Sequence, residues 1–202
     1  RRAFLLQGHI GAAWQDGQYH RTRDLDECKR FFQDFMTRLR TDYVDIGMLH
    51  FVDTQADYEA LLKSGMVEYA QELKRQGVKA VGMSSHDPVV ARQAAEAGLI
   101  DVLMFSINPA FDLLPENVIV DDLLEKKSYE NRPFAGVNPV RERLYRTCEA
   151  RGVGITVMKT LGAGSLLSAG SSPFGKALTS AQCISYALTR PAVSSVLIGC
   201  KT

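Results

Sequence analysis

The sequence predicts an α/β protein built around a parallel β-sheet. Strand-like and helix-like segments alternate along all 202 residues, which is the pattern of repeated βα units. The strand-like segments are apolar throughout, as expected of strands covered on both faces. Each helix would then be a right-handed crossover to the next parallel strand. We count six such strands and expect one domain that takes up residues 1–202.

Composition narrows the classes of partner. Hydrophobic residues make up 46% of the chain and charged residues 23%, with a net charge of +1, as in ordinary globular proteins. Because the charges of both signs are interspersed, we expect neither nucleic acid nor a membrane surface as a partner. No apolar run approaches the roughly 18 residues of a membrane span. The four cysteines are widely spaced, which favours reduced thiols and a cytoplasmic location: Cys28, Cys148, Cys183 and Cys200.

The first half of the chain contains three of the six strands. Phe4–Ile10 is predicted to be a buried strand, and the polar, Gly-containing residues 11–23 a loop. A helix is expected over residues 24–39, where the apolar residues share one helical face and Asp24 with Glu27 has the spacing of a capping box. The next elements are a strand at Tyr43–Phe51, a helix over roughly 56–75 and a strand at Val78–Ser84.

The second half repeats the alternation after one long interruption. Residues 109–138 carry many charges, two prolines and only patchy helical periodicity. Connections of that length usually border a binding site, so we predict a loop or lid there. The regular elements of this half are a helix over 88–97, a strand at Ile100–Ile107, a helix over 139–151, a strand at Val153–Met158, a helix at Thr179–Thr189 and a strand at Val193–Ile198.

Histidines stand at or near the ends of three successive predicted strands. His9 lies near the end of the first, His50 follows an apolar run in Arg38–His50, and His86 follows the third. The carboxyl ends of parallel strands are where α/β proteins place their chemistry. We therefore predict that the three imidazoles mark a functional site.

Several longer segments resemble the aldo-keto reductase superfamily, in that family's order. They are Arg38–His50, Glu72–Ser85, Asp101–Met104 with Asn108, Met158–Gly164 and Tyr186–Gly199. The residues Leu6–His9 and Ser84–His86 resemble those of a branch of this superfamily that often carries an iron–sulfur domain downstream. The cysteine spacing needed for a cluster is absent from this sequence, so such a domain would follow Thr202.

This resemblance implies a (β/α)8 TIM barrel, of which the chain contains roughly strands three to eight. Two earlier strands are therefore expected before Arg1. It also implies NADPH-dependent hydride transfer to a small aldehyde or ketone, with NAD possible as the cofactor. The family's catalytic histidine matches His50, while its lysine falls on His9. Imidazole is mostly neutral at pH 7 and cannot replace an ammonium ion, so His9 is expected to polarise the carbonyl or to relay a proton.

Aromatic residues in exposed loops often line the rim of a pocket, so Trp14 and Tyr19 are expected to border the substrate, and His86 with them. The other site predictions follow from the resemblance. The family's proton-donating tyrosine is not matched, because Tyr19 and Asp24 lack its spacing. The residues expected to bind the cofactor are Ser84, Ser85, Asn108, Met158, Lys159, Leu161, Gly162, Gly164, Gly199 and Lys201. Met158 stands at the position of the aromatic that stacks on nicotinamide, and Met104 at that of a glutamine.

Two other functions are also compatible with the sequence. One is a metal-dependent hydrolase, in which His9, His50 and His86 would bind zinc, with Asp45 and Asp101 nearby in sequence. Asp45 and Asp101 lie at the starts of their strands, however, so they belong at the opposite ends from the histidines. The other is a catalytically inactive relative that binds a dinucleotide, which the missing tyrosine and the lysine-to-histidine change favour.

Overall fold

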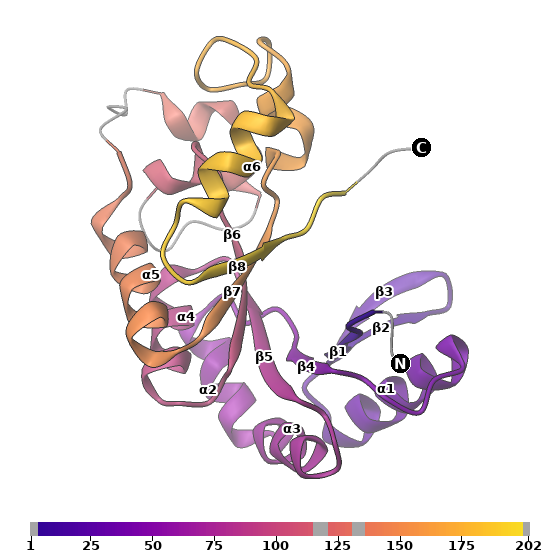
Figure 1. Ribbon diagram of the computed structural model, residues 1–202. Helices are drawn as coiled ribbons and strands as arrows, with labels where there is room; N and C mark the ends of the chain where they lie inside the picture. Colours follow the sequence, from indigo (N-terminus) through magenta and orange to yellow (C-terminus); the bar gives the residue numbers. More distant parts are fainter. Residues whose placement is uncertain (1–3, 115–120, 131–135, 200–202) are drawn as a thin grey trace.

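Six parallel strands form the main sheet of the computed structural model, which describes residues 4–114, 121–130 and 136–199 (Figure 1). In the order in which they pair, the strands are β1 (Gln7–Ile10), β4 (Ile46–Leu49), β5 (Ala80–Ser85), β6 (Val102–Ser106), β7 (Gly154–Met158) and β8 (Val193–Val196). Every pairing is parallel, and β1 and β8 are the two edges. The sheet is therefore open and curved. Its six strands pair in the order in which they follow one another along the chain, as the sequence predicts.

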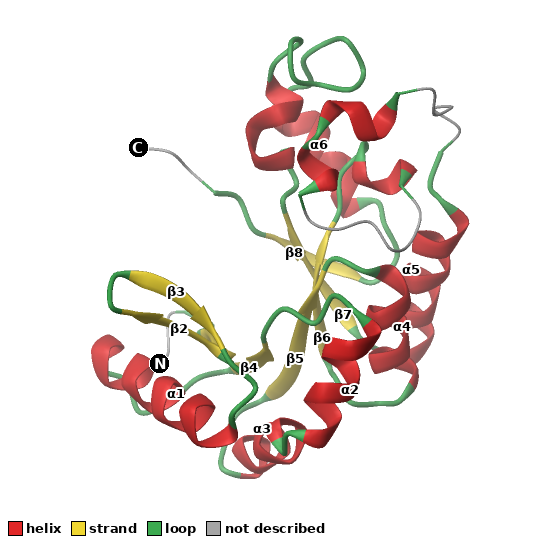
Figure 2. Cartoon of the chain, turned by 180° about the vertical axis from the view of Figure 1, so that it is seen from behind, coloured by secondary structure: helices red, strands yellow, loops and turns green. Residues whose placement is uncertain are grey.

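Helices cover the outer side of this curved sheet (Figures 1 and 2). They are α1 (Leu25–Leu39), α2 (Gln55–Lys63), α3 (Met66–Arg75), α4 (Pro88–Glu96), α5 (Pro139–Arg151) and α6 (Ser180–Leu188). Local chemistry fixes their starts: the Asp24 side chain accepts a hydrogen bond from the Glu27 amide, and Thr179 forms a capping box with Gln182. Along β5, every residue from Val81 to Ser85 is buried, which confirms a strand covered on both faces.

Two of the predicted elements are wrong. Residues 11–23 are not a loop: β2 (Ala12–Gln15) and β3 (Gln18–Arg21) form an antiparallel hairpin beside α1. Residues 56–75 are not one helix, because Gly65 adopts a left-handed φ of 79° and separates α2 from α3. The strand predicted at Phe4–Ile10 is also shorter, since only Gln7–Ile10 pairs with β4.

The described parts of residues 109–138 contain short 3₁₀ helices in place of an unstructured loop. These are η1 (Phe111–Leu113), η2 (Asp122–Leu124) and η3 (Lys126–Tyr129), which follow the carboxyl end of β6. Together with Leu166 in η4 (Gly162–Leu167) and Cys183, their apolar residues make a second, smaller core. A role of this segment as a lid stays a prediction.

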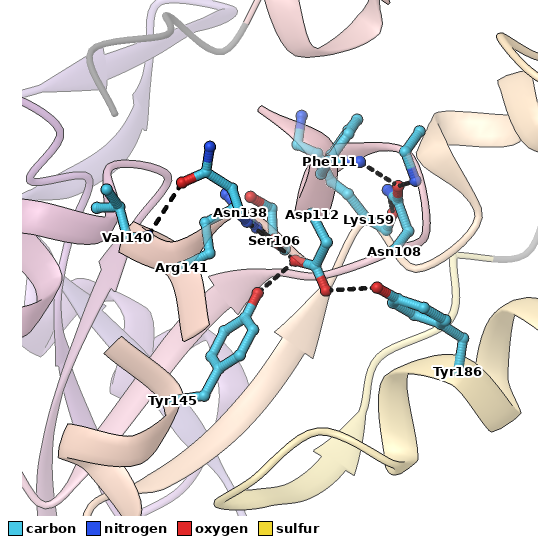
Figure 3. A network of polar contacts seen from close by, with 11 residues as sticks. Ser106, Asn108, Phe111, Asp112, Asn138, Val140, Arg141, Tyr145, Lys159 and Tyr186 are labelled. Atoms are coloured by element: carbon cyan, nitrogen blue, oxygen red, sulfur yellow. Dashed lines mark hydrogen bonds and ion pairs between the residues drawn. The ribbon is translucent and has the colours of Figure 1, made fainter. Parts of the chain in front are cut away.

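A buried carboxylate fixes the start of this segment. Asp112 is completely buried and accepts hydrogen bonds from Arg141 Nε at 2.9 Å, Tyr145 Oη at 2.5 Å and Tyr186 Oη at 2.9 Å (Figure 3). Arg141 also donates to the Ser106 carbonyl at the end of β6. Because the donors come from α5 and α6, one ionic cluster joins η1 to both helices.

Candidate functional site

Two of the three predicted histidines are in direct contact. His9 in β1 and His50, directly after β4, bring their Nδ1 atoms to 2.9 Å, with ring centroids 4.8 Å apart. The parallel pairing of β1 with β4 produces this contact, because it places Ile10 opposite Leu49 and ends both strands at the same level. The backbone amide of His50 donates to the Ile10 carbonyl and continues the pairing by one residue.

The β2–β3 hairpin adds a tyrosine to this pair. Tyr19 Oη lies 2.5 Å from His50 Nε2, so both ring nitrogens of His50 are hydrogen-bonded. The sequence contained a signal for this hairpin that our prediction did not use. Asp16-Gly17 is a typical type I′ turn pair, and both residues adopt left-handed φ angles, 52° and 76°. That turn pairs Trp14 with Tyr19 and returns the chain to the histidines.

Contacts from two other elements hold the backbone after β4 in place. Arg23 donates to the carbonyls of His50 and Phe51 at 2.9 and 2.7 Å. Ser84 Oγ accepts a hydrogen bond from the Phe51 amide at 2.8 Å. Phe51 has a φ of 50°, an unfavourable conformation for a non-glycine residue. The surrounding contacts therefore fix the position of the His50 ring.

The histidine pair is neutral at physiological pH. Burial, together with the smaller electrostatic effects of His9, Arg23 and Arg21, lowers the pKa of His50 to about 4 against an opposing effect of Asp53. Burial also lowers the pKa of His9. Burial raises the pKa of Tyr19, while the positive charges of Arg21 and Arg23 act in the opposite direction. The three groups thus form a chain of uncharged hydrogen-bonding partners.

A cavity of about 360 Å³ lies against these residues beside the edge strand β1. It is large enough for a small organic molecule. Trp14, predicted to border the substrate, lines this cavity and is 66% exposed. The rest of the lining comprises His9, Ala12, Ala13, Tyr19, Phe31, Asp34, Phe35, Arg38 and His50.

His86 does not join the other two histidines. Its backbone amide and its Nδ1 both bond to the Asp53 carboxylate, at 2.7 and 2.9 Å, and its ring packs against Phe51. Asp45 and Asp101 pair with Lys79 and Lys74 at the starts of their strands. In the part of the chain that the structure describes, no group of three His, Cys, Asp or Glu residues is arranged to hold a metal ion. This arrangement does not favour the hydrolase hypothesis.

A second cavity, of about 470 Å³, lies at the ends of β7 and β8. Five residues predicted to bind the cofactor line it or its loop, which turns sharply: Lys159, Gly162 and Gly164 all have left-handed φ angles. Thr160, also in the lining, is 1% exposed, and its Oγ1 has no hydrogen-bond partner among the described residues. The full lining is Lys159, Thr160, Leu161, Ala163, Gly164, Leu167, Leu197, Ile198 and Gly199.

The other predicted cofactor residues already have structural contacts. Asn108 is completely buried; its Nδ2 donates to the Lys159 carbonyl, and its Oδ1 accepts from the amides of Ala110 and Phe111. Ser85 Oγ accepts a hydrogen bond from the Asp87 amide. Met158 is half-buried at the end of β7. Lys201 lies outside the described residues.

Comparison with known proteins agrees with this architecture. A family model described as the aldo/keto reductase family matches residues 12–177. The chain belongs to the aldo/keto reductase family. No curated protein sequence matches it significantly.

Two solved aldo-keto reductase structures share its fold. One is PA4992 from Pseudomonas aeruginosa, assigned to the aldo-keto reductases, with a TM-score of 0.63 and 18% identity over 96% of this chain. Another is AKR11C1 from Bacillus halodurans, in its holo form, with a TM-score of 0.63 and 20% identity over 95% of this chain. The chain spans 61% of the length of each. Its six-stranded α/β wall therefore matches part of the aldo-keto reductase barrel.

The cavity at β7 and β8 has groups that suit the phosphates of a dinucleotide. Lys159 contributes a positive charge to its lining, while the amides of Gly162 and Gly164 already donate to the carbonyls of Lys159 and Leu161. The unpaired Thr160 hydroxyl offers a further hydrogen bond in a buried position. The residues present thus fit one end of the family's cofactor.

Proposed function

We propose that this aldo/keto reductase chain reduces a small aldehyde or ketone at the expense of NADPH, or of NADH. The observation that carries this proposal is the contact between His9, His50 and Tyr19 at the carboxyl ends of β1 and β4. Bound reduced nicotinamide would supply the hydride. The chain's own residues then have to stabilise the carbonyl oxygen as negative charge develops there.

His50 and its neighbours are suited to that task. A neutral imidazole can donate one hydrogen bond without carrying a charge into the buried site. The cavity beside β1 would hold the substrate between Trp14 and the histidine pair, with His86 behind Phe51. The Lys159–Gly164 loop, Ser84 and Gly199 would hold the cofactor, and Asn108 would act by fixing the Lys159 carbonyl. Ser85, Met158 and Lys201 remain proposed cofactor contacts.

Consumption of NADPH in the presence of a panel of aldehydes and ketones tests the proposal directly. We expect turnover by the wild-type chain and a roughly 10²–10³-fold lower kcat for His50→Asn, the usual cost of one donor at a developing oxyanion. His20→Asn is the matched control, because His20 lies on β3 and bonds to Glu27 instead. Failure of the chain to bind NADPH would refute the proposal.

A catalytically inactive, dinucleotide-binding relative is the second candidate. It is favoured by the neutral His9 at the family's lysine position. Tight binding of NADPH without turnover of any carbonyl would establish it. The preference for NADP, a cytoplasmic location, two strands before Arg1 and an iron–sulfur domain after Thr202 remain predictions from the family resemblance.

A further inference from the structure

The hairpin places an arginine beside the histidine pair. Residues two apart on a strand lie on the same face, so Arg21 and Tyr19 of β3 point in the same direction. Tyr19 bonds to His50. Arg21 lies over Phe51, the residue after His50, with its guanidinium carbon 4.6 Å from the centre of that ring. The rings of Phe51 and His50 are 6.0 Å apart, so one aromatic ring separates a positive charge from the imidazole.

Arg21 differs from two other arginines at the site in having no partner for its charge. Arg23 donates to two backbone carbonyls, and Arg38 forms an ion pair with Asp34 at 2.7 Å. Arg21 is exposed, and among the residues that the structure describes no carboxylate pairs with its guanidinium. Its contact with an aromatic ring supplies no oxygen acceptor, so its N–H donors remain available to a ligand.

The carboxylates at the site leave this charge uncompensated. Burial lowers the pKa of His50, and the charge of Arg21 adds to that effect, so the guanidinium acts electrostatically on the imidazole. Asp53 acts on His50 in the opposite direction, but its carboxylate accepts two hydrogen bonds from His86. Asp34 is held by Arg38. An anion bound next to His50 would therefore be attracted to Arg21.

The neighbouring cavity suits the apolar part of such a ligand. Its volume is about 360 Å³, and four aromatic side chains contribute to its lining: Trp14, Tyr19, Phe31 and Phe35. Ala12 also lines it and is paired with Arg21 across the hairpin, so the cavity and the guanidinium belong to the same region of the hairpin. A molecule with an apolar group, a carbonyl and an anionic group would find a matching partner for each.

We propose that Arg21 binds a carboxylate of the substrate, and that the chain therefore reduces an oxo acid. This proposal rests on the carbonyl-reductase function proposed above and names its substrate class. The carbonyl would lie at His50 and the apolar part in the cavity. The planar guanidinium matches a carboxylate with two parallel hydrogen bonds. The carboxylate takes no part in the reduction, but its fixed position orients the carbonyl.

Matched pairs of substrates test the proposal by kinetics. Phenylglyoxylate and its methyl ester share one ketone and differ in charge, and 4-oxobutanoate with its methyl ester adds a longer spacing between carbonyl and charge. Arg21→Gln should lower kcat/KM for at least one acid by about tenfold, the effect of losing a hydrogen bond to a charged group, and leave both esters unchanged. Arg146→Gln is the control, because Arg146 lies on α5 and pairs with Glu149.

The outcomes separate this proposal from the reductase function. Equal changes for acids and esters in Arg21→Gln, or turnover by the wild type of neutral carbonyls alone, would overturn the oxo-acid proposal and leave the reductase function standing. Absence of turnover of any carbonyl would overturn both. The Kd for NADPH, measured by its fluorescence, should be the same in wild type and Arg21→Gln. Weaker NADPH binding with unchanged kinetics for the acids would show that Arg21 holds a cofactor phosphate, which would also overturn the proposal.

Carboxylate binding is also tested without turnover. Phenylacetate and phenylacetamide have no ketone to reduce and differ in the charge of one group. Titration calorimetry of the chain saturated with NADPH should give a Kd for phenylacetate about tenfold lower than that for phenylacetamide. We expect Arg21→Gln to abolish this difference. Equal affinities of the wild type for the two compounds would contradict a carboxylate site at Arg21.

Discussion

The neutrality of His50 connects the chemistry of the site to its stability. Its ring is held between His9 and Tyr19, and burial lowers its pKa to about 4, well below the ordinary value of 6.5. The folded state therefore resists protonation that the unfolded chain accepts. Since the lowered pKa belongs to a base, its effect on folding is absent above about pH 6.5 and becomes destabilising as the pH falls toward 4.

We expect His50→Asn to reduce this loss of stability on acidification. Between pH 7 and pH 5, the free energy of unfolding of the wild type should fall more steeply than that of the variant, because the variant has no imidazole to protonate on unfolding. Urea unfolding at the two pH values measures the difference. His20→Asn provides the comparison, and equal pH dependence in wild type and His50→Asn would contradict the account.

At the scale of elements, the hairpin decides whether Tyr19 reaches the histidines. Gly11 joins β1 to β2 with a φ of 91°, and a Cβ there would lie 2.9 Å from the Thr22 carbonyl oxygen. Gly17 in the turn also has a left-handed φ, but its Cβ would meet nothing within 4 Å. An alanine at Gly17 would therefore introduce backbone strain alone, whereas an alanine at Gly11 would introduce strain and also clash with the backbone of Thr22.

Gly11→Ala should cost at least about 2 kcal/mol of stability and displace Tyr19 from His50, because it combines a left-handed alanine with a backbone clash. Gly17→Ala should cost about 1 kcal/mol and leave the site intact. Thermal unfolding measures the first effect, and the His50 ¹⁵N shifts in the two variants measure the second. The same disturbance of His50 by both substitutions would argue against this role of Gly11.

The buried Asp112 cluster is the second element-scale feature. Arg141 is 1% exposed, and its removal would leave the carboxylate of Asp112 without its counter-charge. We expect Arg141→Met to destabilise the chain by about 3–5 kcal/mol. Arg143→Met on the exposed face of the same helix should change the free energy of unfolding by less than about 0.5 kcal/mol. Similar unfolding midpoints in urea for the two variants would contradict a structural role of the ion pair.

The elements with a clear apolar pattern were predicted from the sequence, whereas the hairpin and the break at Gly65 were not. In strands such as β6, Val102 to Phe105 are all apolar, so their burial was predictable from composition. The hairpin strands have four residues each and carry the exposed Trp14 and Tyr19, so they lack the apolar pattern of a buried strand. The break at Gly65 was missed because apolar residues continue across it with helical spacing.

The candidate site was also predictable only in part. His9 and His50 followed from their positions at strand ends, and the parallel register makes them meet. His86 has an equivalent position in sequence, but the carboxylate of Asp53 holds its ring away from the pair. Tyr19 contacts His50 across 31 residues of sequence, a contact that no local pattern reveals.

At the scale of the whole molecule, the two cavities lie near opposite edges of the six-stranded sheet. The cavity of about 360 Å³ lies beside β1, and the cavity of about 470 Å³ lies at the ends of β7 and β8. The residues at the ends of β4 and β5 lie between them in the strand order. In the part of the chain that the structure describes, no helix is long and apolar enough to cross a membrane.

A crystal structure of the chain with NADP⁺ tests the central claim most directly, because it places the cofactor relative to the contact between His9, His50 and Tyr19. We expect the phosphates against the Lys159–Gly164 loop, with Thr160 in a hydrogen bond, and the nicotinamide ring facing the cavity shared by His50 and Tyr19. A nicotinamide ring bound away from that cavity, with Tyr19 and the two histidines out of reach of any carbonyl beside it, would contradict the account.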